Sequence, residues 1–195
     1  FKPLSEKEGA LILTAKRNPA EQINLRKLEQ IDEEKIIKKA QIKGDFKESE
    51  MPAPEELILK KGAQVLFIKN DPESSWVNGT IGKVNGINKK KDILVEIDGT
   101  EVIVRRFKWE KKEQHYNEAT NSFETEVTGT FKQYPVILGW AVTIHRAQGL
   151  TLDSCVVDLG EGAFAAGQAY VALSRCKTLD SLILKEELEE SDIKL

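Results

Sequence analysis

The sequence has few of the features that mark secreted, membrane-spanning or nucleic-acid-coating proteins. It has only two cysteines, Cys155 and Cys176, each without a partner at metal-ligand spacing, so we expect no metal site and no disulfide framework. No apolar run approaches the roughly 20 residues that cross a bilayer, and the N-terminus carries no signal-peptide pattern. A net charge of -3 disfavours a protein that simply coats nucleic acid. We therefore expect a cytoplasmic protein with no membrane partner and with both cysteines buried as small side chains.

The chain also lacks a phosphate-binding loop. No G-x-x-x-x-G-K-[ST] segment occurs, and we find no matching acidic pair that would hold Mg²⁺. The chain begins with Phe1 rather than Met, which suggests a piece of a longer protein. Its 195 residues, 40% hydrophobic and 31% charged, suit one globular domain or one domain that carries a small insertion.

The first 60 residues mix helix and strand patterns. Residues 10–15 form an apolar run of strand length. Asn18-Pro19, followed by Glu21, predicts an N-cap with a capping box for a helix that ends near Leu28. Residues 31–44 fit either a helix or a strand, because their charges allow the first and their alternation allows the second. The polar, Pro-rich residues 48–56 predict a connection or a short helix start.

Short β-strands dominate the middle of the chain. Asp98-Gly99 is a strong two-residue turn between alternating segments, which predicts a hairpin. The run of short strands over about 78–130 predicts a small antiparallel barrel inserted into a larger unit.

The pattern then returns to alternating strands and helices. Residues 139–149 predict a short buried helix, residues 152–160 a buried strand, residues 164–176 a helix, and residues 181–187 a final strand. Such alternation predicts a parallel α/β sheet with both faces covered. We therefore expect an α/β fold in which one discontinuous lobe, residues 1–77 and 131–195, is interrupted by the inserted barrel, residues 78–130.

The segment TIHRAQGLTLD, residues 143–153, concentrates polar side chains beside a glycine. Hydroxyls, an amide and a cation next to a flexible backbone are what a loop needs to contact phosphates. The same pattern fits an amphipathic helix that ends at a glycine C-cap, and the pattern alone leaves both interpretations open.

Arg175 follows the apolar segment AYVALS, residues 169–174. On this position alone it is a surface residue or a helix C-terminal cation that the helix dipole favours. The alternative is a planar cation presented to a phosphoryl group, because its five-donor fork stabilises transition-state charge.

TIHRAQG, followed about 20 residues later by YVALSRC, closely resembles motifs V and VI of superfamily 1 DNA helicases of the RecD-like and PIF-type branch. ILTAKRNPAEQIN, residues 12–24, is similar to the segment that opens this family's second RecA-like lobe. Residues 43–84 resemble its run into an inserted Src-homology-3-like barrel. The resemblance covers essentially the whole chain and implies a RecA-like, P-loop NTPase-type parallel sheet interrupted by that barrel.

The resemblance implies roles for individual residues. Arg175 occupies the position of the catalytic arginine finger that reaches the γ-phosphate, and Gln148 and Gly149 match residues that face the nucleotide cleft. The positions that match contacts with single-stranded DNA are Thr14, Thr143, His145 and Thr151. The match at Thr14 is loose, because the family usually has an Asn directly after this Thr and here Ala15 follows.

The expected barrel carries basic and aromatic residues with two possible roles. Lys83, and with it the group Lys89, Lys90, Lys91, Arg105 and Arg106, would contact phosphates or form an ordinary solvated face. Trp76 and Trp109 would stack on bases or belong to the core. We expect His115 to be a surface residue.

The resemblance further implies that ATP and Mg²⁺ are held mainly by a first RecA-like lobe that this chain lacks, so the chain alone should hydrolyse no ATP. The expected function is the C-terminal motor lobe of an ATP-dependent DNA helicase, with single-stranded DNA and the first lobe as partners. The alternatives are a non-catalytic module of the same fold that binds single-stranded nucleic acid, and a scaffold domain that has lost the chemistry.

Overall fold

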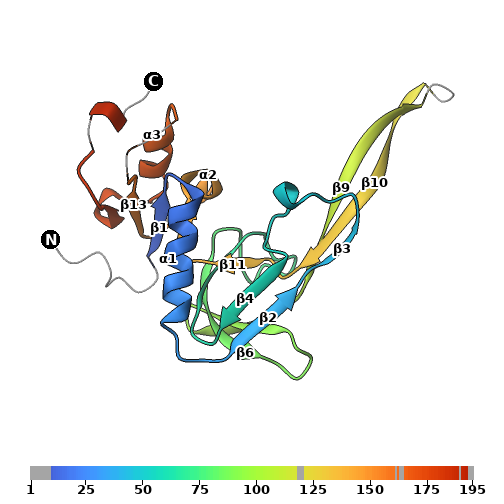
Figure 1. Cartoon of the computed structure of the whole chain (residues 1–195), viewed down its shortest axis with the longest axis horizontal. Helices are drawn as coiled ribbons and strands as arrows, with labels where there is room; N and C mark the ends of the chain where they lie inside the picture. Colours follow the sequence, from blue (N-terminus) through green and yellow to red (C-terminus); the bar gives the residue numbers. More distant parts are fainter. Residues whose placement is uncertain (1–9, 118–120, 161, 163–164, 189, 193–195) are drawn as a thin grey trace.

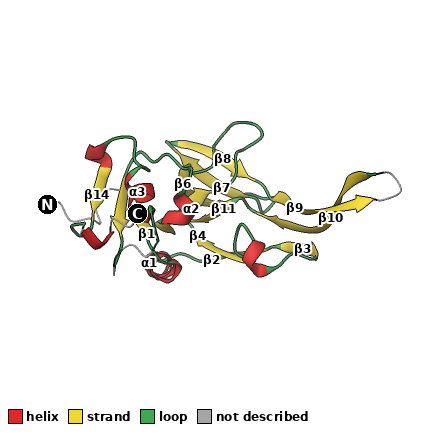
Figure 2. Cartoon of the chain, turned by 90° about the horizontal axis from the view of Figure 1, so that it is seen from above, coloured by secondary structure: helices red, strands yellow, loops and turns green. Residues whose placement is uncertain are grey.

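The computed structural model describes residues 10–117, 121–160, 162, 165–188 and 190–192. These residues form a small parallel α/β part and a larger part built from antiparallel strands (Figures 1 and 2). The expected α/β fold with a parallel sheet and additional antiparallel strands is thereby confirmed. Within the described residues, none of the helices combines the length and the apolarity needed to cross a membrane.

The parallel sheet contains four strands in the order β12-β1-β13-β14. Its central strands are buried on both faces, with Leu11 and Cys155 each 0% exposed on one face and Thr14 and Val156 1% and 2% exposed on the other. The helix α1 lies on one side of β1, and α2 and α3 lie on the other (Figures 1 and 2). This is the arrangement expected for parallel strands, which need cover on both faces. The elements are β1 (Leu11–Thr14), α1 (Arg17–Glu29), β12 (Ala141–Thr143), α2 (Ile144–Ala147), β13 (Cys155–Asp158), α3 (Gln168–Leu173) and β14 (Leu182–Leu184), with the 3₁₀ turns Leu179–Ser181 and Glu190–Asp192.

The helix α1 begins earlier than the sequence predicts. Its N-cap is Lys16, without a side-chain hydrogen bond, so the predicted capping box at Asn18 is wrong. The hydroxyl of Thr14 donates instead to the carbonyl of Lys16 at 2.8 Å and helps to fix the turn into the helix. Pro19 then falls in the first turn, where a missing backbone N–H removes no helical hydrogen bond. Farther along the helix, the side chain of Asn24 joins α1 to β12 by donating to the Ala141 carbonyl at 2.7 Å.

The antiparallel part is built on a five-stranded sheet in the order β11-β5-β6-β7-β8. The predicted hairpin is present as β7 and β8, with Asp98 and Gly99 at φ values of 48° and 78°, as a tight two-residue turn requires. Residues 31–44, ambiguous in the sequence, contain the strands β2 and β3 and no helix. The elements are β2 (Lys35–Lys39), β3 (Gln41–Gly44), a 3₁₀ turn (Glu48–Glu50), β4 (Glu56–Lys60), β5 (Gln64–Phe67), β6 (Ile81–Ile87), β7 (Ile93–Ile97), β8 (Thr100–Val104) and β11 (Val136–Leu138).

A long hairpin extends from this part as an arm (Figures 1 and 2). It is formed by β9 (Phe107–Asn117) and β10 (Ser122–Gln133), and β3 pairs with the base of β10. The expected insertion, residues 78–130, does not coincide with one closed sheet, because the five-stranded sheet also recruits β5 and β11 and the arm belongs to a different sheet. The division into domains at residues 78 and 130 stays a prediction.

The buried amide of Gln133 joins three segments of the antiparallel part. Gln133 is 0% exposed and its Nε2 donates to the carbonyls of Lys38, Pro54 and Glu55 at 2.9, 3.2 and 3.1 Å. Its Oε1 accepts from the backbone N–H of Tyr134 at 3.0 Å. The buried amide therefore ties together part-buried carbonyls of β2 and of the segment before β4.

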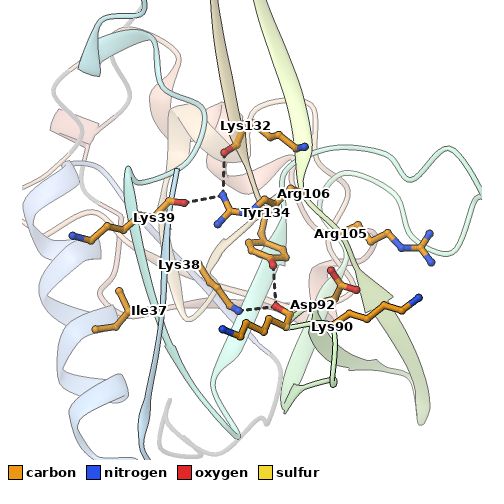
Figure 3. A pocket seen from close by; sticks show the side chains of 10 residues that line it. Ile37, Lys38, Lys39, Lys90, Asp92, Arg105, Arg106, Lys132 and Tyr134 are labelled. Atoms are coloured by element: carbon orange, nitrogen blue, oxygen red, sulfur yellow. Dashed lines mark hydrogen bonds between the residues drawn. The ribbon is translucent and has the colours of Figure 1, made fainter. Parts of the chain in front are cut away.

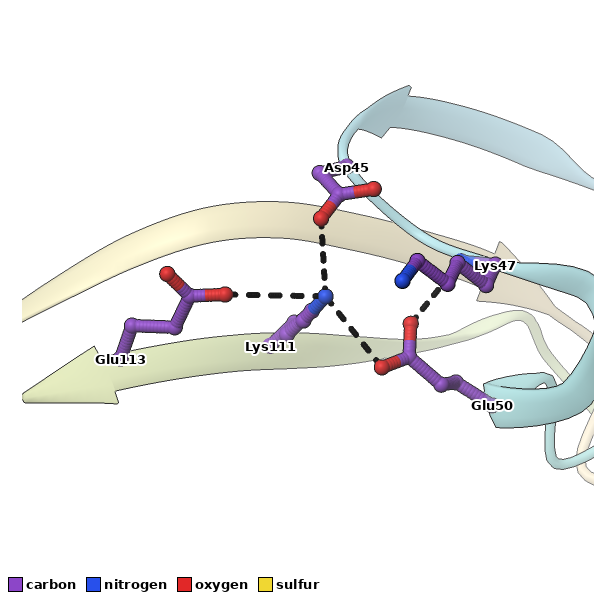
Figure 4. A network of polar contacts seen from close by, with 5 residues as sticks. All are labelled: Asp45, Lys47, Glu50, Lys111 and Glu113. Carbon is purple, nitrogen blue, oxygen red and sulfur yellow. Dashed lines mark hydrogen bonds and ion pairs between the residues drawn. The ribbon is translucent and has the colours of Figure 1, made fainter.

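Three carboxylates surround Lys111 near the base of the arm and form the Lys111 cluster (Figure 4). The Nζ of Lys111 on β9 lies 2.9 Å from Asp45, 3.2 Å from Glu50 and 3.6 Å from Glu113. Hydrogen bonds to Asp45 raise the pKa of Lys111 above its ordinary value. The pKa of Asp45 is lowered by its hydrogen bond to Lys111, and the pKa of Glu50 is lowered first by its hydrogen bond to the backbone of Lys47.

We expect Gln133→Leu to lower the free energy of unfolding by about 1–3 kcal/mol, because the part-buried carbonyls of Lys38 and Pro54 lose the hydrogen bonds from the amide. Urea denaturation measures the difference. The matched control is Gln114→Leu at an exposed position of β9, which should change stability by about 0.5 kcal/mol or less. Equal effects of both substitutions would show that the amide of Gln133 has no special role.

The Lys111 cluster should give a pH-dependent stability. Asp45 and Glu50 have lowered pKa values, so their contribution is complete above the ordinary Glu pKa of 4.5 and is lost as the pH falls through the lowered values. Lys111 has a raised pKa, so its contribution is complete below the ordinary value of 10.5. Between these limits Lys111→Gln should lower the denaturation midpoint, and below pH 4 the difference from wild type should shrink. A difference that stays constant into acid would contradict this assignment.

Candidate functional site

The chain changes from strand to helix at Thr143. Thr143 ends β12 and is the N-cap of α2, since its Oγ1 accepts from the backbone N–H of Arg146 at 3.2 Å. The predicted buried helix over residues 139–149 is therefore wrong in its first half, where residues 141–143 pair with β1 as a parallel strand. Within α2, Ile144 and Ala147 are buried and His145 is exposed.

Gln148 and Gly149 end this helix at the surface. Both residues are exposed, and Gly149 has a φ of +83°, in the left-handed region that disfavours residues with a Cβ. A Cβ at Gly149 would meet no atom within 4 Å, so the glycine is required by backbone conformation and not by lack of space. The C-terminal glycine considered for this segment is thus observed. At the position that resembles motif V, the side-chain amide of Gln148 is therefore exposed, and no other atom crowds the backbone of Gly149.

Arg175 lies just beyond α3, and three hydrogen bonds hold its guanidinium group in place. Nε donates to the carbonyl of Val171 at 2.8 Å, Nη1 to the carbonyl of Leu150 at 3.2 Å, and Nη2 to the hydroxyl of Ser174 at 2.8 Å. The side chain is half-buried. The guanidinium carries five N–H groups, and three of them are used here, which leaves two for another acceptor.

Backbone hydrogen bonds join the two segments that resemble motifs V and VI. The N–H of Leu152 donates to the Arg175 carbonyl at 2.9 Å, and the N–H of Lys177 donates to the Leu152 carbonyl at 3.2 Å. Arg175 adds the side-chain bond to Leu150, across 25 residues of sequence. In addition, the Nζ of Lys177 forms an ion pair with the Oδ1 of Asp153 at 2.5 Å. The structure therefore brings Arg175 next to the loop that starts at Gln148 and Gly149.

The residues predicted to contact DNA do not form a single cluster. Thr143, His145 and Thr151 belong to α2 and the loop that follows it. Lys83 is exposed on β6, in the five-stranded sheet. Thr14 is 1% exposed and its hydroxyl bonds within the lobe. A contact of the chain with a phosphate at that turn would therefore come from the exposed residues after Ala15 and not from the Thr14 hydroxyl.

The two cysteines lie in contact, which the sequence did not indicate. The Sγ atoms of Cys155 and Cys176 are 2.8 Å apart, so the expectation that each stands alone is wrong. Cys155 is buried, as expected, and Cys176 is half-buried. Burial, reinforced by the contact with Cys176, raises the pKa of the Cys155 thiol. In the described residues no three His, Cys, Asp or Glu side chains gather as a metal site requires, so we assign no Mg²⁺ ligand to them.

Sequence reasoning missed two residues that hold the site together. Gln168, at the start of α3, is 4% exposed and donates to the Ala15 carbonyl at 3.3 Å, which connects α3 to the turn after β1. Arg146 donates to the carbonyl of Pro52 and so connects α2 to the segment before β4. Neither contact has a local signal, because each partner lies about a hundred residues away in sequence or farther.

The same fold occurs in known helicases. No family model matches the chain. It is 37% identical over 170 residues to the "ATP-dependent DNA helicase Pif1" of Bdellovibrio bacteriovorus, over 85% of this chain and 36% of that protein. It is 35% identical over 143 residues to the mouse "ATP-dependent DNA helicase PIF1", over 69% of this chain and 20% of that protein.

Solved structures of Pif1 from Bacteroides agree with these relatives. The unliganded protein matches with a TM-score of 0.86 and 30% identity, over 96% of this chain and 43% of that chain. The complex with ADP-AlF4 matches with a TM-score of 0.82, 32% identity and coverage of 97% and 43%. The complex with single-stranded DNA matches with a TM-score of 0.74, 31% identity and the same coverage. The chain thus spans less than half the length of the helicases it resembles.

We expect Gly149→Ala to lower the free energy of unfolding by about 1–2 kcal/mol, the cost of a left-handed backbone for a residue with a Cβ. Gly149→Asn should lower it less, because Asn tolerates this conformation. Thermal denaturation of the two variants beside wild type measures the effect. If Ala and Asn are equally well tolerated, the left-handed turn at residue 149 is not a constraint on the loop.

Proposed function

Because this chain belongs to the Pif1 family of superfamily 1 DNA helicases, we propose that it forms the second RecA-like lobe, with its inserted barrel, of an ATP-dependent DNA helicase. The chain corresponds to 36% of the Bdellovibrio relative, so the remaining parts of the motor lie outside it. The cytoplasmic location expected from the sequence stays a prediction.

The observation that carries this proposal is the position of Arg175. It lies beside the loop that contains Gln148 and Gly149, and it is held there by backbone and side-chain hydrogen bonds. A guanidinium that keeps two N–H groups available can bind two oxygens of one phosphate. Such a preorganised cation lowers the barrier to phosphoryl transfer because it need not reorganise as charge develops.

In the proposed reaction ATP binds between this lobe and a first RecA-like lobe. The first lobe supplies the phosphate-binding loop and the Mg²⁺ ligands, and this lobe supplies Arg175 at the γ-phosphate, with Gln148 and Gly149 at the edge of the cleft. The binding of ADP-AlF4 by the Bacteroides relative supports a nucleotide site in this family. Since one lobe provides only half of the site, the chain alone should hydrolyse no ATP.

Single-stranded DNA would bind at the end of β12 and along the residues that follow it. Half-buried Thr143 and exposed His145 and Thr151 carry hydroxyl and imidazole groups there, and such groups contact the sugar-phosphate backbone without reading sequence. The binding of single-stranded DNA by the Bacteroides relative supports this partner. ATP binding would close the two lobes, and hydrolysis would reopen them, so that the strand moves past these contacts.

We expect Arg175→Ala in the complete helicase to lower ATP turnover by about 10³–10⁵-fold, the range measured for arginine fingers. Arg175→Lys should not restore turnover, because Lys lacks the planar fork. The matched control is Lys61→Ala, an exposed lysine outside the two segments that resemble motifs V and VI, which should leave ATP turnover unchanged. Steady-state ATPase assays with saturating single-stranded DNA measure the effect.

The same variants test the alternative of a binding module without a motor. Arg175→Ala should leave the affinity for single-stranded DNA unchanged within about twofold, and its circular dichroism spectrum should match wild type. If the variant keeps normal ATP turnover, the assignment of Arg175 as the arginine finger is wrong.

A further inference from the structure

The two cysteines of the chain lie in contact in the parallel α/β part. Their Sγ atoms are 2.8 Å apart, although 21 positions of sequence separate them. Cys155 is the first residue of β13, and Cys176 follows α3, directly after Arg175. Both are free thiols, and both pack in the hydrophobic cluster of the parallel sheet. The fold therefore places two unbonded thiols within reach of each other, beside the segment that resembles motif VI.

Paired backbone holds both thiols in this arrangement. Cys155 lies in a central strand, opposite Leu11 of β1 and Leu182 of β14. Cys176 forms a parallel bridge with Leu152, three residues before Cys155. The two hydrogen bonds of this bridge join Leu152 to the backbone of the residues that flank Cys176. The contact of the sulfur atoms is thus a consequence of sheet pairing, and it does not depend on two flexible side chains meeting by chance.

The two thiols differ in their access to solvent. Cys155 is 0% exposed, whereas Cys176 is half-buried. Burial raises the pKa of the Cys155 thiol, and its hydrogen bond with Cys176 raises that pKa further. Because the thiolate is the reactive form, a reagent from solution should meet Cys176 first. Cys155 would react only with a group already attached to Cys176.

We propose that Cys155 and Cys176 form an oxidisable dithiol, which takes small-molecule disulfides as its reagent and closes to an intramolecular disulfide. In the first step the Cys176 thiolate attacks one sulfur of the reagent, whose S–S bond breaks and releases one thiolate. In the second step the Cys155 thiolate attacks the Sγ of Cys176 and expels the other half of the reagent as a second thiolate. The two protons lost by the protein thiols pass to these leaving groups. Two protein thiols are thereby oxidised to one disulfide, and one reagent disulfide is reduced to two thiols.

The disulfide would close a loop from Cys155 to Cys176 that contains α3. A cross-link between distant positions restricts the unfolded chain and so favours the folded state. It would also tie the residue after Arg175 covalently to a central strand of the sheet. Oxidation should therefore stabilise this part of the molecule and hold the Arg175 segment more firmly. An effect on ATP turnover rests on the proposed function, whereas the effect on stability does not.

The first test is a redox titration of the 195-residue chain with mixtures of reduced and oxidised glutathione. Acid quenching, alkylation with N-ethylmaleimide and intact-mass spectrometry count the remaining thiols and any bound glutathione. At oxidising ratios the wild type should lose two hydrogens, retain no glutathione and take up no N-ethylmaleimide. A retained glutathione, a disulfide-linked dimer, or two thiols that stay open to alkylation at every ratio would overturn the proposal.

Single-cysteine variants test the order of the two steps. Cys155→Ala should accumulate the mixed disulfide of Cys176 with glutathione, because the second attacking thiol is absent. Cys176→Ala should keep Cys155 as a thiol, because the buried side chain does not meet the reagent. Circular dichroism under reducing conditions checks that both variants fold. Glutathione bound to Cys155 in a folded Cys176→Ala variant would overturn the proposal that Cys176 reacts first.

A comparison of folded and unfolded wild type requires no variant. In urea the two thiols are no longer held together. At a fixed concentration of reduced glutathione, half oxidation should then need about 100-fold more glutathione disulfide than in the folded chain. Equal concentrations in both states would show that the fold does not hold the pair and would overturn the proposal. The titration involves no nucleotide, so a failure of the Arg175 assignment leaves its outcome unaffected, and the reverse also holds.

Discussion

The antiparallel half of this molecule depends on one buried amide. Gln133 pairs with carbonyls of β2 and of the chain before β4, and with the N–H of the residue that follows it. These three segments come from positions 38, 54–55 and 134, and no other side chain in the described structure contacts all of them through hydrogen bonds. Because the amide binds the backbone of Lys38 and Tyr134, and both of these side chains donate to the Lys91 carbonyl, its bonds also help to hold the turn between β6 and β7 against β2 (Figure 3).

The chain around Gln133 also connects the two halves. Phe131 and Ile137 pack in the cluster that supports the parallel sheet, whereas Tyr134 and Val136 pack in the cluster of the antiparallel strands. A few consecutive residues therefore enter both cores, and close-packed interiors transmit displacement because they have low compressibility. The segment from Phe131 to Ile137 is therefore packed into both hydrophobic cores.

The elements with local signals were predictable from the sequence, and those with distant partners were not. The strands at Leu11–Thr14 and Cys155–Asp158 and the Asp98-Gly99 turn follow from periodicity and turn chemistry. The resemblance at TIHRAQG and YVALSRC led to the family, and the structure places Arg175 against the loop at Leu150 and Leu152. The Asn18 cap failed because the Thr14 hydroxyl, bonded to Lys16, starts the helix earlier. Gln133 carries no local pattern, since its partners Lys38, Pro54 and Glu55 lie 78 to 95 residues away in the sequence.

The bonds of Arg175 show why a helix-end cation and an arginine finger need not be rival descriptions. Its bonds to Val171 and Ser174 are those of a residue that completes a helix terminus, and its bond to Leu150 fastens the neighbouring loop. A long, flexible side chain loses rotamer entropy when it becomes ordered, and these three bonds stabilise the ordered form before any nucleotide arrives. The structural role would therefore prepare the catalytic role proposed for Arg175. A cation already held beside the loop at Leu150 would meet a γ-phosphate without further ordering, which is the condition for strong transition-state stabilisation.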